Sequence, residues 1–257
     1  AAGRASWPVR MAAKYFIPSL QKWDQQSAKQ VDHFIAISDY VAKRIQKIYA
    51  RESQVIYPPV ELRRFAIAPA QEVGDHYLVV SALAPYKGVD LAIECFNKNG
   101  KKLQIIGKGP QDQRLRKMAG PNIEFLGWQS DDFVAKAMAR CRAFLLPCEE
   151  DFGITPLESM AAGRPVIAMG KGGALETVIA KDFPGQEPAQ LTRPGNEPTG
   201  IFFADAQPQS LAEAVEKMEN SHQDFDPKAL RARAAQFDES IFLEELRSML
   251  RSHGIAL

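Results

Sequence analysis

Residues 143–168 read AFLLPCEEDFGITPLESMAAGRPVIA, and this stretch decides the fold. It begins with an apolar run at 143–146 and ends with another at 165–168, and both have the composition of strands covered on both faces. Between them lie a loop that contains Gly153 and an apolar, helix-like segment. A strand, a helix and a second strand in this order predict a parallel βαβ unit with a right-handed crossover.

The same alternation extends from about residue 77 to residue 203. Further β-rich runs lie at 77–81, 103–106, 123–126 and 200–203, and helix-like stretches lie at 90–98, 111–119 and 131–140. This alternation predicts an α/β fold with a Rossmann-like, doubly wound parallel sheet. Such sheets bind ligands beyond the carboxyl ends of their strands, so a site is expected in the loops that leave each strand.

The segments on either side of the alternation look different. Residues 1–65 predict only two helices and two short strands, with Ser38 as a helix N-cap and Pro18 limiting how early the first helix begins. So few elements cannot close a core of their own. We therefore expect 1–65 to be the tail of another domain with a linker, 66–225 to be the sheet domain, and 226–257 to form C-terminal helices.

The composition narrows the functional classes. The chain of 257 residues carries 32 Lys and Arg against 31 Asp and Glu, a formal net charge of +1 that gives no reason to expect nucleic acid as a partner. Its three cysteines and four histidines lack metal-ligand spacing. No apolar run reaches the ~20 residues that span a bilayer. We expect a cytoplasmic protein without a transmembrane segment, with peripheral attachment at the inner face of the membrane as the alternative.

Two interpretations of Glu158 stay open. In the first, Thr155 is the N-cap and Glu158 the third helical residue of a capping box, with Pro156 at the first helical position. In the second, Glu158 and Glu150 each hold a pair of ligand hydroxyls, because a carboxylate accepts two charge-assisted hydrogen bonds. Gly153 would then let the backbone approach that ligand closely.

This segment resembles the signature of family 4 glycosyltransferases, in which two glutamates separated by seven residues flank a Phe-Gly pair. Glu150 and Glu158 have that spacing, with Phe152 and Gly153 in register. The resemblance implies the C-terminal, donor-binding half of a retaining GT-B enzyme. It implies that Glu150 binds the hydroxyls of the donor sugar and Glu158 the ribose of the nucleotide. The backbone of Phe152, Gly153 and Ile154 would line the sugar site.

The loop after the first strand of the sheet fits the same resemblance. It begins at Ser81, and Lys87 would place its ammonium on the donor pyrophosphate and neutralise the departing nucleotide. Catalytic roles are accordingly expected for Lys87 and Glu150. Many relatives carry an arginine shortly before this lysine, where the present chain has Ala82. The phosphates are therefore expected to depend more on Lys87 and on helix N-termini.

Two further loops are expected to contribute to donor binding. Gly107 and Lys108 follow the second strand of the sheet, although a plain turn explains this short G-x-G pattern equally well. At Gly127 and Trp128 the resemblance implies backbone contacts to the base. Trp128 itself is expected to be a packed aromatic rather than a stacking platform.

A glycine turn is expected to complete the donor site. Gly172 and Gly173 stand between a strand and a helix, where free N–H groups form an anion site. The resemblance places this turn by the sugar and the diphosphate. It implies no metal and no cofactor, because lysine and helix dipoles take the role that a divalent cation would otherwise fill.

The sequence most resembles mannosyltransferases of polysaccharide and O-antigen assembly. The resemblance lies in residues 150–156, together with 57–60 and 85–87. We therefore expect GDP-mannose as the donor, with a UDP-hexose as the main alternative, and a glycan or a lipid-linked acceptor. Complete family members carry a further N-terminal domain. A missing domain or a separate chain is therefore expected to complete the enzyme, and the present chain is expected to bind donor but to transfer poorly.

Two rival functions stay open at this point. A non-catalytic module could sense or store a nucleotide sugar. However, a site that has lost its catalytic activity need not keep both glutamates and Lys87. A GT-B epimerase or phosphorylase is the third interpretation. The epimerase would need acid and base groups of its own, and a phosphorylase usually carries a pyridoxal lysine that the sequence does not identify.

Overall fold

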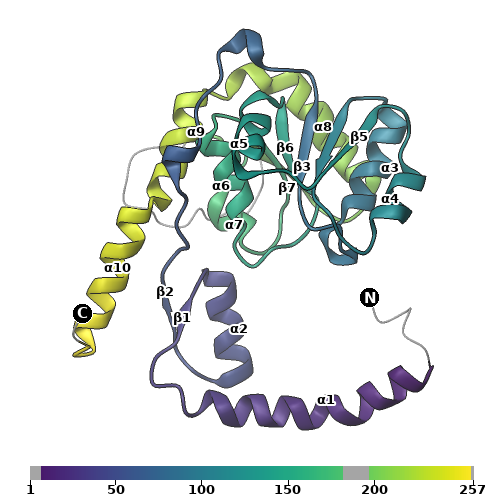
Figure 1. Ribbon diagram of the computed structural model, residues 1–257. Coiled ribbons are helices and arrows are strands. Elements are labelled where there is room, and N and C mark those ends of the chain that lie inside the picture. Colours follow the sequence, from purple (N-terminus) through teal and green to yellow (C-terminus); the bar gives the residue numbers. More distant parts are fainter. Residues whose placement is uncertain (1–6, 182–196, 256–257) are drawn as a thin grey trace. The chain divides into compact units, whose positions relative to one another are not determined.

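The computed structural model describes residues 7–181 and 197–255 (Figure 1). The chain divides into two compact units, Ala1–Ile56 and Tyr57–Leu257. The second unit contains the sheet and the candidate site. The domain boundaries predicted after residues 65 and 225 stay predictions.

A six-stranded parallel sheet forms the centre of the second unit, in the order β5-β4-β3-β6-β7-β8. Its strands are β3 (Tyr77–Val80), β4 (Leu103–Ile106), β5 (Ile123–Gly127), β6 (Ala143–Leu146), β7 (Val166–Met169) and β8 (Gly200–Phe203). The chain runs outward from β3 to β5 on one side and from β6 to β8 on the other. This confirms the predicted doubly wound sheet, and it places the ligand crevice of such folds at the carboxyl ends of β3 and β6.

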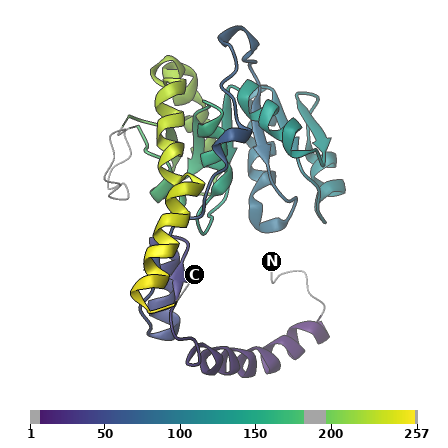
Figure 2. The ribbon, with the colours of Figure 1, turned by 60° about the vertical axis from the view of Figure 1, so that its left-hand side comes forward.

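Helices cover the sheet on both faces (Figures 1 and 2). They are α3 (Val89–Asn99), α4 (Asp112–Met118), α5 (Asp131–Arg140), α6 (Ile154–Ala161), α7 (Ala174–Thr177) and α8 (Pro208–Ser221). Helix α3 packs against α4 and α8, whereas α5 packs against α6. Strands β6 and β7 are buried at every residue, which explains why the corresponding sequence runs are apolar throughout.

The residues before β3 and after α8 join the same core. Val60 and Phe65 are buried, and the Val60 N–H donates to the carbonyl of Phe237 at 2.8 Å. Arg231, in α9 (Pro227–Ala234), donates through Nη1 to the carbonyls of Phe65 and Ala161, at 2.7 and 2.6 Å. The last helix, α10 (Glu239–Ser252), follows. One core therefore includes the entry segment, the sheet and the C-terminal helices up to Phe237.

The first unit consists of α1 (Trp7–Ala28), β1 (Ile35–Ala36), α2 (Asp39–Tyr49) and β2 (Gln54–Val55). Its two short strands pair in parallel. Ser38 caps α2 as predicted, because its hydroxyl accepts from the Val41 N–H at 3.0 Å. Pro18 lies inside α1, so the prediction that it limits the start of the helix is wrong. Because α1 buries no residue, water can bond the carbonyl that proline leaves without a donor.

No helix within residues 7–181 and 197–255 is long and apolar enough to cross a membrane. Helix α1 has sufficient length at 22 residues, but charged side chains at Arg10, Lys14, Lys22 and Asp24 interrupt it.

Candidate functional site

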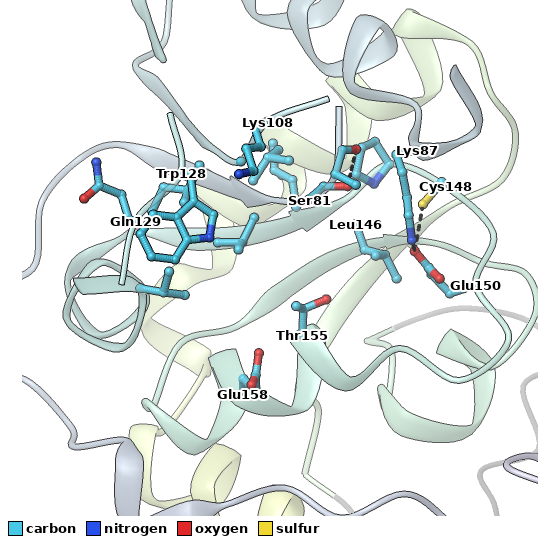
Figure 3. A pocket seen from close by; sticks show the side chains of 18 of the residues that line it. Ser81, Lys87, Lys108, Trp128, Gln129, Leu146, Cys148, Glu150, Thr155 and Glu158 are labelled. Carbon is cyan, nitrogen blue, oxygen red and sulfur yellow. Dashed lines mark hydrogen bonds and ion pairs between the residues drawn. The ribbon is translucent and has the colours of Figure 1, made fainter. Parts of the chain in front are cut away.

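A cavity of about 650 Å³ opens at the carboxyl ends of β3, β4 and β6 (Figure 3). This volume is in the range of sites for small organic ligands and cofactors. Seven of the residues predicted for donor binding line it, namely Ser81, Lys87, Gly107, Lys108, Trp128, Glu150 and Glu158. They come from four loops and one helix, and the switch in strand order brings them together.

The other predicted residues do not line this cavity. Phe152 is buried at 3% exposure, Gly153 is the N-cap of α6, and Ile154 is the first residue of that helix. Gly127 precedes Trp128 at the end of β5. Gly172 and Gly173 lie against the backbone of the loop at 150–152. The binding roles predicted for these residues stay predictions.

Lys87 and Glu150 are bonded to one another. Lys87 ends a short 3₁₀ turn after β3, and its Nζ lies 2.5 Å from Glu150 Oε1. The Cys148 thiol donates to the same oxygen at 3.4 Å. Burial would lower the pKa of Lys87, but the hydrogen bond and the charge of Glu150 outweigh burial and raise it. Burial, reinforced by the Glu150 charge, raises the pKa of Cys148 to about 12, so this thiol is a neutral donor.

The predicted capping box is wrong. Helix α6 begins at Ile154, two residues earlier than expected, and its N-cap is Gly153 with φ 89° and no side-chain hydrogen bond. Thr155 and Pro156 are therefore the second and third helical residues. Pro156 remains in the first turn, where its missing N–H costs no intrahelical bond. Since no N-cap side chain takes part, Glu158 is not held in a capping box and its carboxylate lines the cavity.

Glu158 lies in a partly buried environment that disfavours its charge. Burial raises its pKa, the positive charge of Arg64 opposes this shift, and the negative charge of Asp131 adds to it. Arg64 Nη2 and Asp131 Oδ2 are 3.4 Å apart, and both residues line the cavity. A ligand that donates hydroxyl hydrogens to Glu158 would stabilise the charged carboxylate.

Trp128 stands at the end of the cavity opposite Lys87 and Glu150 (Figure 3). Its side chain is 68% exposed, so the prediction of a packed aromatic is wrong. Lys108 Nζ lies 5.9 Å from the centroid of the indole ring, and Gln129 Nε2 donates to the carbonyl of Leu126 at 2.6 Å. An exposed indole at the rim of the cavity offers a flat surface on which a planar group can stack.

The glycine turn is closed against the loop that carries Glu150. The Gly173 N–H donates to the Glu150 carbonyl at 2.8 Å, and a Cβ at residue 173 would lie 2.3 Å from the Cα of Phe152. Gly107 is similar, because a Cβ there would lie 1.9 Å from the carbonyl oxygen of Ser81. These glycines let neighbouring loops approach each other, and the Gly173 N–H is already engaged.

Sequence reasoning missed several lining residues. Arg64 comes from a 3₁₀ turn before β3 (Leu62–Arg64), outside the loops that follow strands. Asp131 begins α5, and Gln129 lies next to Trp128. Cys148 lies in the loop between β6 and α6. Nothing in the local sequence distinguishes these residues, because only the sheet topology brings them to the cavity.

Among the described residues, 7–181 and 197–255, no three His, Cys, Asp or Glu side chains gather to hold a metal ion.

Comparison with known proteins defines the class. Residues 65–237 match the family described as Glycosyl transferases group 1. Because this match covers more than half of the chain, the chain belongs to that family. A glycosyltransferase of Methanocaldococcus jannaschii, described as uncharacterized, is 31% identical over 153 residues, which cover 58% of this chain and 43% of the relative. A GDP-mannose-dependent alpha-(1-6)-phosphatidylinositol monomannoside mannosyltransferase of Mycobacterium tuberculosis is 31% identical over 172 residues. These residues cover 55% of this chain and 45% of the relative.

The likeness to solved structures concerns the fold. Anabaena HepE, in complex with UDP-glucose, matches with a TM-score of 0.74 and 20% identity, covering 93% of this chain and 69% of that chain. The architecture is therefore that of GT-B glycosyltransferases. The chain spans about half the length of the curated relatives it matches.

Glu158→Gln is expected to stabilise the protein at pH 7. The folded state raises the pKa of Glu158, so the ionised carboxylate costs stability above that pKa, and this cost vanishes below the unfolded pKa. We expect the melting temperature to rise by roughly 2–4 °C, the shift that about 1 kcal/mol gives at this chain length. The gain should fade as the pH approaches about 4. Glu216→Gln, on the exposed face of α8, is the control, and an equal gain in both variants would refute the explanation.

The Lys87–Glu150 pair is expected to contribute measurable coupling to folding. A double-mutant cycle of urea unfolding with Lys87→Met and Glu150→Gln should give a coupling of about 1–2 kcal/mol, because both side chains are at most one-quarter exposed. The Lys102–Asp75 pair has similar geometry at 3.0 Å, but it is 66% and 68% exposed. It should give less than about 0.5 kcal/mol. Equal couplings for the two pairs would show that partial burial adds nothing.

Proposed function

We propose that this chain is the nucleotide-sugar-binding half of a retaining glycosyltransferase, and that its donor is GDP-mannose. One observation carries the proposal. Glu150 and Glu158, which have the spacing of the family 4 signature, line a single cavity together with Lys87 at the switch point of a doubly wound sheet. Membership in the Glycosyl transferases group 1 family supports it.

The two ends of the cavity suit the two ends of such a donor (Figure 3). The base would stack near Trp128, and the ribose hydroxyls would bond to Glu158. The diphosphate would lie towards Lys87, and the sugar towards Glu150. An exposed aromatic suits the planar base, and carboxylates suit vicinal hydroxyls because each accepts two hydrogen bonds.

Donor binding would then exchange the partners of Lys87. The diphosphate competes with Glu150 for the ammonium, and the carboxylate that is released can accept hydrogen bonds from the sugar. The same ammonium stabilises the negative charge that develops as the nucleoside diphosphate leaves. Lys87 would therefore have two partners, one after the other. They are the Glu150 carboxylate in the empty site and the phosphates in the occupied site.

The choice of GDP-mannose rests on the sequence resemblance and on the relatives. The Mycobacterium tuberculosis relative is named as GDP-mannose-dependent, which supports the same donor here. A UDP-hexose is the competing choice, and the UDP-glucose complex of Anabaena HepE has the same fold. The base therefore has to be identified by direct measurement.

Transfer to an acceptor requires more than the described site. Because the matched relatives are about twice as long as the segments that align with this chain, we include in the proposal a second domain or a separate chain. That part would bind a glycan or a lipid-linked acceptor in the cytoplasm or at the inner face of the membrane. The exposed aromatic and aliphatic side chains of α1, such as Phe16, Leu20 and Trp23, are a surface that this part could cover.

Calorimetric titration of the chain with GDP, UDP, GDP-mannose and UDP-glucose tests the donor assignment. We expect GDP-mannose to bind most tightly. Glu158→Ala should lower the affinity for every one of these nucleotides by at least about tenfold, because each loses hydrogen bonds from its ribose to a charged acceptor. Glu216→Ala is the matched control on α8 and should bind like the native chain. Tighter binding of UDP-glucose would replace the proposed donor, and no binding of any of the four would reject the proposed function.

A further inference from the structure

An aromatic cluster packs against the loop that carries Glu150. Tyr57 stacks on Phe152 with ring centroids 5.6 Å apart, and it meets Phe237 edge-on at 5.4 Å. The ring centroids of Phe152 and Phe237 are 5.8 Å apart, and the two residues are 3% and 2% exposed, respectively. Since Phe152 follows Glu150 by two residues, the Tyr57 ring supports the loop that holds one of the two candidate donor-binding glutamates.

The Tyr57 hydroxyl contacts α7, the short helix that follows the glycine turn at Gly172 and Gly173. It donates to Glu176 Oε2 at 3.1 Å, and Glu176 is 8% exposed, three residues after Gly173. The carbonyl of Glu176 accepts from Arg233 Nη2 at 2.6 Å. The Arg233 guanidinium also lies 5.2 Å from the centroid of the Phe237 ring. One tyrosine therefore touches the loop that carries Glu150 with its ring and the helix directly after the glycine turn with its hydroxyl.

The two loops are bonded to each other as well. The Gly173 N–H donates to the Glu150 carbonyl at 2.8 Å, and Glu150 and Gly172 form an isolated parallel bridge. Because the approach leaves no space for a Cβ at residue 173, neither loop can move far without the other. The backbone position of Glu150, and with it the carboxylate that bonds Lys87, depends on how these loops are held.

We propose that Tyr57 is a positioning residue for the sugar end of the donor site. Its ring fixes Phe152 and its hydroxyl fixes Glu176, and together they keep Glu150 and the glycine turn in register. This inference rests on the proposed function and deepens it, because it assigns control of the sugar end to a residue that does not line the cavity. A phenylalanine would fill the same stack, so packing alone does not account for a hydroxyl directed at a nearly buried carboxylate.

Tyr77 provides a matched control for the hydroxyl. Its hydroxyl also donates to a glutamate, Glu219, at 2.6 Å, and its side chain is fully buried. It stands at the first residue of β3, so this bond lies at the opposite end of the strand from the cavity. Tyr57→Phe and Tyr77→Phe therefore remove the same kind of bond, one beside the candidate site and one remote from it.

Amide hydrogen exchange followed by NMR tests the positioning without any ligand. The exchange of Gly173 should accelerate about tenfold in Tyr57→Phe, the factor expected for loss of one hydrogen bond to a charged group, and further in Tyr57→Leu. In Tyr77→Phe it should stay within about twofold of the native rate, because that bond is remote from the turn. Equal acceleration in Tyr57→Phe and Tyr77→Phe, or none in either Tyr57 variant, would overturn the inference.

Titration with GDP and GDP-mannose, and with UDP and UDP-glucose, tests the consequence for binding. In Tyr57→Phe the affinity for the nucleotide sugar should fall about tenfold, whereas the affinity for the nucleoside diphosphate should change less than about twofold. Such a split is not expected from general destabilisation, which would weaken both ligands alike. Tyr77→Phe should show neither effect.

The outcomes separate the two proposals. If the native chain binds none of the four ligands, the proposed function fails and the role of Tyr57 at a sugar site fails with it, even if the exchange of Gly173 responds. If the native chain binds a nucleotide sugar more tightly than its diphosphate and Tyr57→Phe keeps that preference, the proposed function stands and the inference about Tyr57 is wrong.

Discussion

The pairing of β3 with β6 is the constraint on which the candidate site depends. Leu78 lies beside Phe144 in parallel register, although the intervening chain forms two strands and three helices. Because parallel strands end at the same edge of a sheet, the loops that carry Lys87 and Glu150 open next to each other. The ion pair between them then follows from side-chain reach. Removing this pairing would separate Lys87, after β3, from Glu150 and Glu158, after β6.

Close backbone approach is the second requirement, and glycine supplies it. Gly107 lies against Ser81, and Gly173 lies against Phe152, at distances that exclude any side chain. From sequence, glycines in such loops are naturally interpreted as space for a ligand. In this protein both glycines let one loop of the site contact the next, which fixes the loops before any ligand arrives. Their packing role explains their presence whatever they contribute to binding.

The fold was predictable from sequence because strands buried on both faces must be apolar throughout, as 143–146 and 165–168 are. Local rules failed where a distant contact or solvent decided the outcome. Pro18 remains inside an exposed helix, and Gly153 rather than Thr155 is the N-cap of α6. The positions of Arg64 and of the Tyr57–Glu176 bond could not be predicted, since 119 residues separate the partners of that bond. The signature located the two glutamates but gave no information about what holds them.

The two glutamates differ in the empty site, and that difference suggests an order of events under the proposed function. Glu150 is paired with the Lys87 ammonium and accepts a hydrogen bond from the Cys148 thiol, whereas burial disfavours the charge on Glu158. Hydroxyls that bond to Glu158 relieve a cost that is already present in the empty site, so ribose binding gains without breaking an existing bond. Sugar binding to Glu150 has to displace an ammonium, and only the diphosphate offers that ammonium a comparable partner. The nucleotide end of the donor would therefore engage the site first. Its phosphates would then take Lys87 from Glu150, and the released Glu150 carboxylate would receive the sugar.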